Sequence, residues 1–156
     1  MIVFSPQTAL PPSLPKARVS RLGWLLGKAL RYRNAKEVGV RFVSEAEMQR
    51  LNKTYRGKNR PTDVLSFGFL DSPQTTDRRR KKSPVSSLQF MDYLGDLAVC
   101  LPYAKREAAR RAIPISEEAI RLLTHGVLHL AGYDHATEKE EQRMFAVQER
   151  IVEQAV

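Results

Sequence analysis

Apolar and polar positions along the chain repeat with two periods, and together these predict a mixture of helices and strands. In residues 17–32, apolar positions recur every three or four residues with basic residues between them, as in an amphipathic helix. Residues 39–43 alternate instead, as a half-buried strand does. The expected strands lie at residues 2–4, 39–43, 63–70 and 94–101, and the expected helices at 17–32, from Ser44 to near Tyr55, from Pro102 through Ala112, from Ser116 and from Thr137 to Ile151.

Three of these helices are expected to begin at a hydroxyl side chain. Ser44 and Thr137 are each followed three residues later by glutamate, the pattern of a capping box. Ser116 is expected to cap its helix, with Glu117 and Glu118 in the first turn, where negative charge is favourable. The final helix carries its apolar side chains at Met144, Phe145, Val147 and Ile151.

The element order β-α-β-α-β-β-α-α-α predicts an α+β (mixed α/β) fold, in which a mixed sheet of about four strands packs with helices. The length of 156 residues fits a single domain over residues 1–156. Residues 71–87 combine Pro, Ser and Thr with five consecutive basic residues, so we expect a flexible basic loop there.

Charge is unevenly distributed along the chain, which has 26 Lys and Arg against 17 Asp and Glu and a net charge of +9. Residues 1–115 hold 22 basic and 9 acidic side chains, whereas residues 116–156 hold 4 and 8. A basic body favours a polyanionic partner, of which nucleic acid is the commonest, and the alternative is a solvated basic surface.

The single cysteine and the absence of long apolar segments indicate the compartment in which the protein is expected. The single cysteine, Cys100, excludes an internal disulfide and a multi-cysteine zinc cluster, and its apolar surroundings predict a buried core residue. We see neither a secretory signal nor a run of about 18 apolar residues, so a cytoplasmic protein without a membrane partner is expected.

The three histidines of the chain, His125, His129 and His135, fall within one short segment. His125 and His129 are four residues apart, so on a helix both imidazoles lie on one face, one turn apart. Gly132 can take the left-handed conformation that ends a helix, and the chain can then bring His135 back to the same ion. Three protein ligands leave a position for water, so the spacing predicts a catalytic metal site on a C-terminal helix and the following turn.

The spacing H-x-x-x-H-x-x-G-x-x-H is also that of metzincin peptidases, which carry a general-base glutamate directly after the first histidine. Here that residue is Gly126, which has no side chain to accept a proton. A metallopeptidase therefore stays open only if another carboxylate substitutes. A non-catalytic ribosome-binding factor with a structural metal is a further alternative.

Two long motifs resemble those of one known family. The segment HGVLHLAGYDH (residues 125–135) and the segment LNKTYRGKNRPTDVLSF (residues 51–67) are similar to the hallmarks of the YbeY family, as is Leu94-Gly95-Asp96 before a strand. The resemblance covers residues 37–151 in the same order. The departures are Asn59 in place of an acidic residue, Gly68 in place of proline, and a longer basic loop.

The resemblance implies a zinc-dependent, single-strand-preferring endoribonuclease that acts in ribosomal RNA processing at the small ribosomal subunit. It implies one Zn²⁺ ion, no small-molecule organic cofactor, and a functional arginine at Arg56. Chemically, zinc can bring the pKa of a bound water near 7 and polarise a phosphoryl oxygen, while a guanidinium can hold two phosphate oxygens. The residues expected to take part are the ligands and catalytic residues His125, His129 and His135, the catalytic and substrate-binding Arg56, and the substrate-binding Arg78, Arg79, Arg80, Lys81 and Lys82.

Some residues keep two interpretations. Asp134 and Asp96 can orient a metal-bound histidine or form local turns. The helical cluster of Lys105, Arg106, Arg110 and Arg111 can hold an RNA backbone or form a solvated face. By resemblance alone, Thr62, Asp63 and Ser66 help to shape the cleft.

Overall fold

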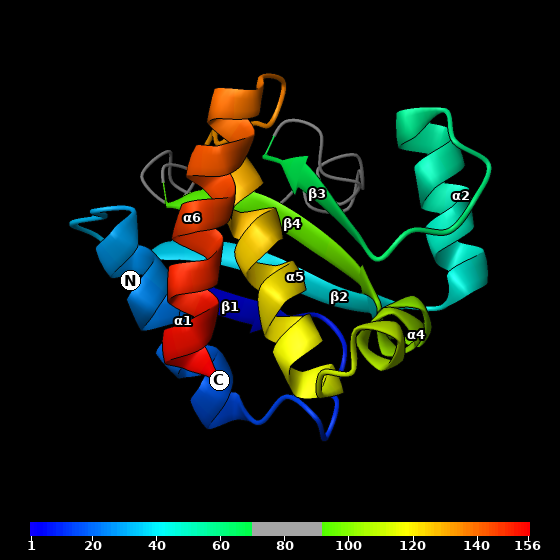
Figure 1. Ribbon diagram of the computed structural model, residues 1–156, viewed down its shortest axis with the longest axis horizontal. Coiled ribbons are helices and arrows are strands. Elements are labelled where there is room, and N and C mark those ends of the chain that lie inside the picture. The colour runs from blue at the N-terminus through cyan, green and yellow to red at the C-terminus, as the bar shows by residue number, and fades with distance from the viewer. Residues whose placement is uncertain (70–91) are drawn as a thin grey trace, which may run out of the picture.

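In the computed structural model, which describes residues 1–69 and 92–156, a four-stranded sheet carries helices on both faces (Figure 1). The strands are β1 (Ile2–Pro6), β2 (Lys36–Val43), β3 (Val64–Gly68) and β4 (Tyr93–Cys100). The helices are α1 (Lys16–Ala29), α2 (Glu45–Arg56), α4 (Leu101–Arg111), α5 (Ile115–Leu130) and α6 (Glu138–Ala155).

The strands run in the spatial order β1-β2-β4-β3. The pairs β1–β2 and β2–β4 are parallel, whereas β3 is antiparallel to β4, with Phe67 opposite Asp96. The sheet is therefore mixed, as the element order predicts, and β3 forms one of its edges. This edge becomes a wall of the site described below.

Side chains of β4 alternate between two apolar clusters, one on each face of the sheet. Leu97 and Val99 belong to the cluster packed under α1, α5 and α6, which lie in front of the sheet in Figure 1. Ala98 and Cys100 belong to a smaller cluster with Met48 of α2 on the opposite face. The core role predicted for Cys100 is confirmed, since its side chain is fully buried and burial raises the pKa of its thiol.

The predicted order of elements is confirmed over the described residues, and the boundaries shift by a few residues. The second strand begins at Lys36 rather than at Gly39, because it pairs with β1 on one side and with β4 on the other. The first helix ends at Ala29.

The cap predicted at Ser116 is wrong. The helix α5 begins at Ile115, and its N-cap is Pro114, whose backbone is extended at φ −62° and ψ 144°. The Pro114 carbonyl accepts hydrogen bonds from the amides of Glu117 and Glu118, so Ser116 lies inside the first turn. Proline fixes its own φ at a value that suits a helix start, and here this outweighs the preference of serine for the cap.

Helix α6 begins as predicted. Thr137 accepts a hydrogen bond from the amide of Glu140, and the Glu140 carboxylate accepts one from the amide of Thr137, so the capping box is complete. Phe145 does not join the buried face of this helix as expected, since it is 42% exposed.

None of the helices in the described ranges 1–69 and 92–156 is long and apolar enough to cross a membrane. The predicted basic loop at 71–87 lies outside the described residues. The single domain over residues 1–156 stays a prediction.

Candidate metal centre

Two of the three histidines are positioned by α5. His125 and His129 lie one turn apart on the same face of this helix, with ring centroids 4.6 Å apart. Their Nε2 atoms face each other at 3.1 Å. The predicted pairing of these imidazoles on one helix face is therefore present.

The third histidine is returned to the helix by a turn. Helix α5 ends at Leu130, and Gly132 then takes a φ of +91°, where a side chain is strained. The amides of Gly132 and Tyr133 donate to carbonyls of the last helical turn, at His129 and Leu128. This reversal brings the ring of His135 to 5.0 Å from that of His129, as the glycine predicts.

The three imidazoles together form a donor set that can hold one metal ion. Each offers one ring nitrogen, and these nitrogens all lie within 4.8 Å of one another. His125 and His129 are half-buried and His135 is exposed, so the cluster is reachable from solvent. Imidazole nitrogens are ligands for zinc, copper, iron and nickel, and the residues therefore fit a divalent transition metal.

The ring of His129 is held neutral by its surroundings. Burial lowers its pKa, and the neighbouring His125 and His135 lower it further, against a hydrogen bond with the backbone of Tyr133. A neutral imidazole is the form that binds a metal. The lowered pKa therefore favours the form of the His129 ring that can act as a metal ligand.

The residue next to the first ligand faces the sheet. A Cβ on Gly126 would lie 2.6 Å from a methyl carbon of Leu97, whose side chain is buried in the core. Any longer side chain at this position would collide with β4. Position 126 therefore cannot present a general-base carboxylate to the histidines, which weakens the peptidase alternative further.

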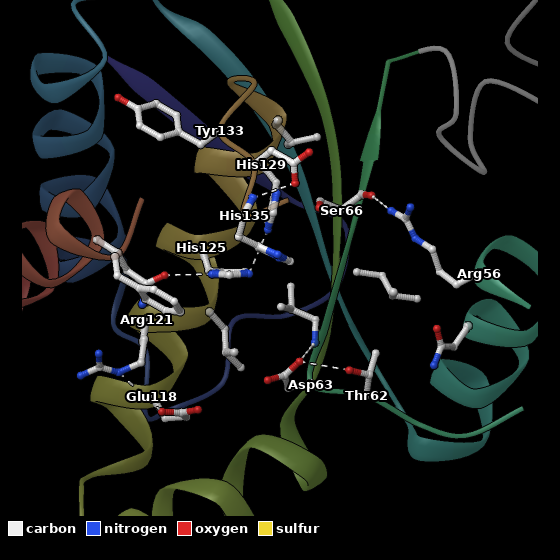
Figure 2. A pocket seen from close by; sticks show the side chains of 18 of the residues that line it. Arg56, Thr62, Asp63, Ser66, Glu118, Arg121, His125, His129, Tyr133 and His135 are labelled. Atoms are coloured by element: carbon white, nitrogen blue, oxygen red, sulfur yellow. Dashed lines mark hydrogen bonds and ion pairs between the residues drawn. The ribbon is translucent and has the colours of Figure 1, made fainter. Parts of the chain in front are cut away.

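The histidines open into a cleft of about 1110 Å³. One wall is the end of α5 with its turn, and the other is β3 with the segment that follows α2, as Figure 2 shows. Arg56, the last residue of α2, lies across β3 from the histidines, and its Nη2 donates to the carbonyl oxygen of Ser66 at 2.9 Å. Arg56 and the three histidines thus line the same cleft from opposite walls.

The segment that follows α2 adds two basic residues that the sequence reasoning did not single out, Lys58 and Arg60. The helix ends at Gly57, in the left-handed conformation with φ +69°. The buried Asn52 then donates through Nδ2 to the Arg60 carbonyl at 2.8 Å and fixes the segment. The signal in the sequence is the Lys-Asn-Arg run directly after a helix-ending glycine.

The residues assigned to the cleft by resemblance do line it. Thr62 and Asp63 lie directly before β3 and Ser66 lies within it, and all three line this wall of the cleft. Asp63 accepts hydrogen bonds from the Thr62 hydroxyl at 3.2 Å and from the Val64 amide at 2.7 Å, so it fixes the start of this strand.

The two aspartates with open interpretations have local contacts. Asp134 accepts a hydrogen bond from the amide of His135 at 2.8 Å, which shapes the turn. Asp96 lies on the sheet face away from α5 and accepts hydrogen bonds from the side chains of Gln7 and Tyr93. The geometry favours local structure over contact with a ligand histidine for both.

A buried ion-pair network forms part of the cleft lining, with Arg111, Glu118, Arg121 and Glu149. Glu118 is 1% exposed and pairs with Arg111 at 3.4 Å and with Arg121 at 3.8 Å. Burial raises the pKa of Glu118, while the two arginines act to lower it. Arg121 also pairs with Glu117 and Glu149. We did not anticipate this network, because its members come from three helices that meet only in the fold.

The two basic segments considered for RNA contact differ in outcome. On α4, Arg106 pairs with Glu45, and Arg110 pairs with Glu107 at 2.6 Å, which favours a solvated face for that part of the cluster. Arg111 lines the cleft but is paired with Glu118. The predicted substrate-binding residues Arg78, Arg79, Arg80, Lys81 and Lys82 lie outside the described residues.

Comparisons with known proteins converge on one family. Residues 16–156 match the family model described as endoribonuclease YbeY. A protein of Persephonella marina named endoribonuclease YbeY is 41% identical over 118 residues, which cover 75% of this chain and 69% of the relative. One of the same name from Shouchella clausii is 39% identical over 117 residues, covering 75% and 71%. A solution structure of a Thermotoga maritima protein has a TM-score of 0.64 and 29% identity, and the match covers 99% of this chain and 89% of that one.

Proposed function

Because the chain belongs to the endoribonuclease YbeY family, we propose that it is a metal-dependent endoribonuclease that cuts single-stranded RNA in the cleft between α5 and β3. The observation that carries the proposal is the convergence of three imidazole nitrogens within 4.8 Å of one another in a cleft whose opposite wall is basic. The family relation supports RNA as the class of substrate, and the geometry supports this cleft as the site where it binds.

The metal of this proposal is one Zn²⁺ ion, held by His125, His129 and His135. Nitrogen ligands suit zinc, and three protein ligands are typical of catalytic rather than structural zinc sites. When bound, zinc would lower the pKa of a coordinated water to near 7 and polarise a phosphoryl oxygen. The protein contributes the three imidazoles, of which His129 has a lowered pKa, and the turn at Gly132 that fixes the third one.

The opposite wall supplies positive charge for the phosphodiester. Arg56, Lys58 and Arg60 line it and can draw phosphates toward the histidines. The guanidinium of Arg56 presents a planar fork, which suits two oxygens of one phosphate and the negative charge that develops during cleavage. Arg56 is held to Ser66 through Nη2, so its position relative to β3 is defined in advance.

The proposed substrate is ribosomal RNA, met at the small ribosomal subunit in the cytoplasm. The family relation supports this assignment, and the net charge of +9 is consistent with a polyanionic partner.

The test is cleavage of a labelled single-stranded RNA by the purified, zinc-loaded protein. We expect cleavage that a chelator abolishes and that zinc restores. Loss of cleavage in His129→Ala, with Gln142→Ala on the exposed face of α6 as a control that stays active, would support the proposal. If metal-loaded wild type binds RNA and leaves it intact, the proposal fails.

The metallopeptidase alternative has a specific obstacle in the fold. Each of the four carboxylates that line the described cleft is engaged: Asp63 and Asp134 by hydrogen bonds, and Glu118 and Glu149 by ion pairs. Together with the buried position of Gly126, this leaves a peptidase without an evident general base among the described residues. Zinc-dependent digestion of casein would reverse this ranking.

A further inference from the structure

One polar side chain is buried in the otherwise apolar face that α6 turns toward α5. Gln148 is 3% exposed and lies among Met144, Ile151 and Val152. A buried amide is unfavourable unless its donor and acceptor are both satisfied. Both are satisfied here, since Oε1 lies 2.9 Å from Nδ1 of His125 and Nε2 lies 3.2 Å from Oε1 of Glu149.

The orientation of this amide follows from its neighbours. Arg121 can only donate hydrogen bonds, and one of its Nη atoms donates to the Glu149 carboxylate. Although burial acts to raise the pKa of Glu149, hydrogen bonds from Arg121 and Gln148 lower it overall, so this carboxylate is ionised and can only accept. The amide nitrogen of Gln148 must therefore face Glu149, which leaves the Gln148 carbonyl oxygen toward His125.

The same reasoning then extends to the imidazole. A carbonyl oxygen accepts, so the His125 Nδ1 that faces it must carry the proton. In a neutral ring the other nitrogen, Nε2, then keeps its lone pair, and this is the atom that faces His129 at 3.1 Å. With the amide reversed, the proton would move to Nε2 and would block the ligand position.

We propose that Arg121, Glu149 and Gln148 are positioning residues that hold His125 in the Nδ1-protonated tautomer, with the Nε2 lone pair presented to the metal. The proposal rests on the metal site proposed above, and it assigns a role to three residues that are not among the proposed metal ligands. Partners of this kind orient a ligand imidazole, and their loss typically weakens metal binding about 10–100-fold. Figure 2 shows the hydrogen bond from His125 at the side of the ring away from the cluster.

The tautomer is measured on the metal-free wild-type protein, so the result does not depend on whether a variant folds. Long-range ¹H–¹⁵N correlation at a pH where the rings are neutral distinguishes a protonated Nδ1 from a protonated Nε2. We expect His125 to carry its proton on Nδ1. A dominant Nε2-protonated form would overturn the proposal.

Zinc affinity is measured by competition with a chromophoric chelator, without RNA. Gln148→Met keeps the size of the side chain but removes the acceptor, and we expect about 10–100-fold weaker binding. Gln148→Glu restores an acceptor and should recover most of the affinity. Gln142→Met, the same substitution at an exposed position of α6, should bind zinc like wild type. Equal affinities for Gln148→Met and wild type, or equal losses in the Met and Glu variants, would contradict the proposal.

Glu149→Met tests the outer part of the network. Removing this acceptor frees the amide of Gln148 to reverse, so the Nε2-protonated tautomer of His125 should become detectable. An unchanged tautomer would remove Glu149 and Arg121 from the proposal. These measurements involve no RNA, so their failure is distinguishable from absence of nuclease activity.

Discussion

Arg56 is the residue whose proposed role depends most on its place opposite the histidines. It comes from the end of α2, whereas the imidazoles come from α5 and its turn, and the cleft lies between them. If Arg56 binds the scissile phosphate, its removal should affect cleavage but leave the metal in place.

We expect Arg56→Ala to lower the rate of RNA cleavage about 10²-fold, the usual effect of losing one donor to a developing anion. Zinc content should stay at the wild-type level. Arg56→Lys should recover only part of the rate, because an ammonium lacks the planar fork. The control is Arg50→Ala, an arginine 75% exposed on the same helix and outside the cleft lining. Equal effects at positions 50 and 56 would contradict the role of Arg56.

The lowered pKa of His129 gives the metal-free protein a pH-dependent stability. The unfolded chain takes up a proton at this residue near pH 6.5, and the folded chain only at lower pH. The stability that His129 contributes is therefore present above about pH 6.5 and is lost as the pH falls toward the folded pKa.

Urea unfolding of metal-free wild type and His129→Asn at several pH values between 7.5 and 5 measures this contribution. The free energy of unfolding of wild type should fall more steeply with decreasing pH than that of the variant. A difference between the two proteins that does not change with pH would show that the folded pKa of His129 is not lowered.

For single residues, spacing in the sequence predicts which neighbouring side chains come together. The roles of the other residues depend on tertiary contacts. The convergence of His125, His129 and His135 follows from one helical turn and one glycine, so the sequence contains it. The roles of Arg121 and Gln148 do not, because each depends on how α5 packs against α6. Asp96 points to the far face of the sheet, which only the register of β4 determines.

Among the elements that line the site, the helices α5 and α6 begin in different ways. Helix α6 begins with a capping box at Thr137, whereas α5 begins at Pro114 with no side-chain cap. A pattern of Ser followed by two glutamates predicts a cap at Ser116, but the preceding proline moves the helix start two residues earlier. The preference of serine for N-cap positions predicts that a helix begins near Ser116, and the backbone of the preceding proline determines the residue at which it begins.

Thr137→Ala should lower the free energy of unfolding by about 1 kcal/mol, because loss of the threonine hydroxyl leaves an amide of the first turn without its acceptor. Ser116→Ala, at the position that only resembles a cap, should change the stability by less than about 0.5 kcal/mol. Chemical denaturation of the two variants gives both values. A larger loss at Ser116 than at Thr137 would contradict the assigned helix starts.

Over the whole molecule, the predicted fold class and the order of strands and helices are confirmed, because apolar periodicity is a property of each segment alone. The spatial order β1-β2-β4-β3 was not predicted, since pairing partners depend on contacts between distant segments. The uneven charge predicts a polyanionic partner, and the fold places the basic residues Lys58 and Arg60, neither of which has a salt bridge among residues 1–69 and 92–156, on one wall of the cleft.

RNA affinity should therefore fall with salt, and Lys58→Ala should reduce the slope of log K against log salt by about 0.7, the value for one phosphate contact on a single strand. Lys105→Ala, an exposed lysine on α4 outside the cleft lining, should leave the slope unchanged. Fluorescence anisotropy across a salt series measures both slopes. A larger change at position 105 than at position 58 would place the RNA on α4.

Titration of zinc into metal-free protein during RNA cleavage tests most directly whether one ion held by three histidines is required. We expect activity to rise in proportion to added zinc, to reach its maximum at about one equivalent, and to stay absent in His129→Ala at the same concentrations. Full cleavage by the metal-free protein, or wild-type cleavage by His129→Ala, would contradict the proposed function.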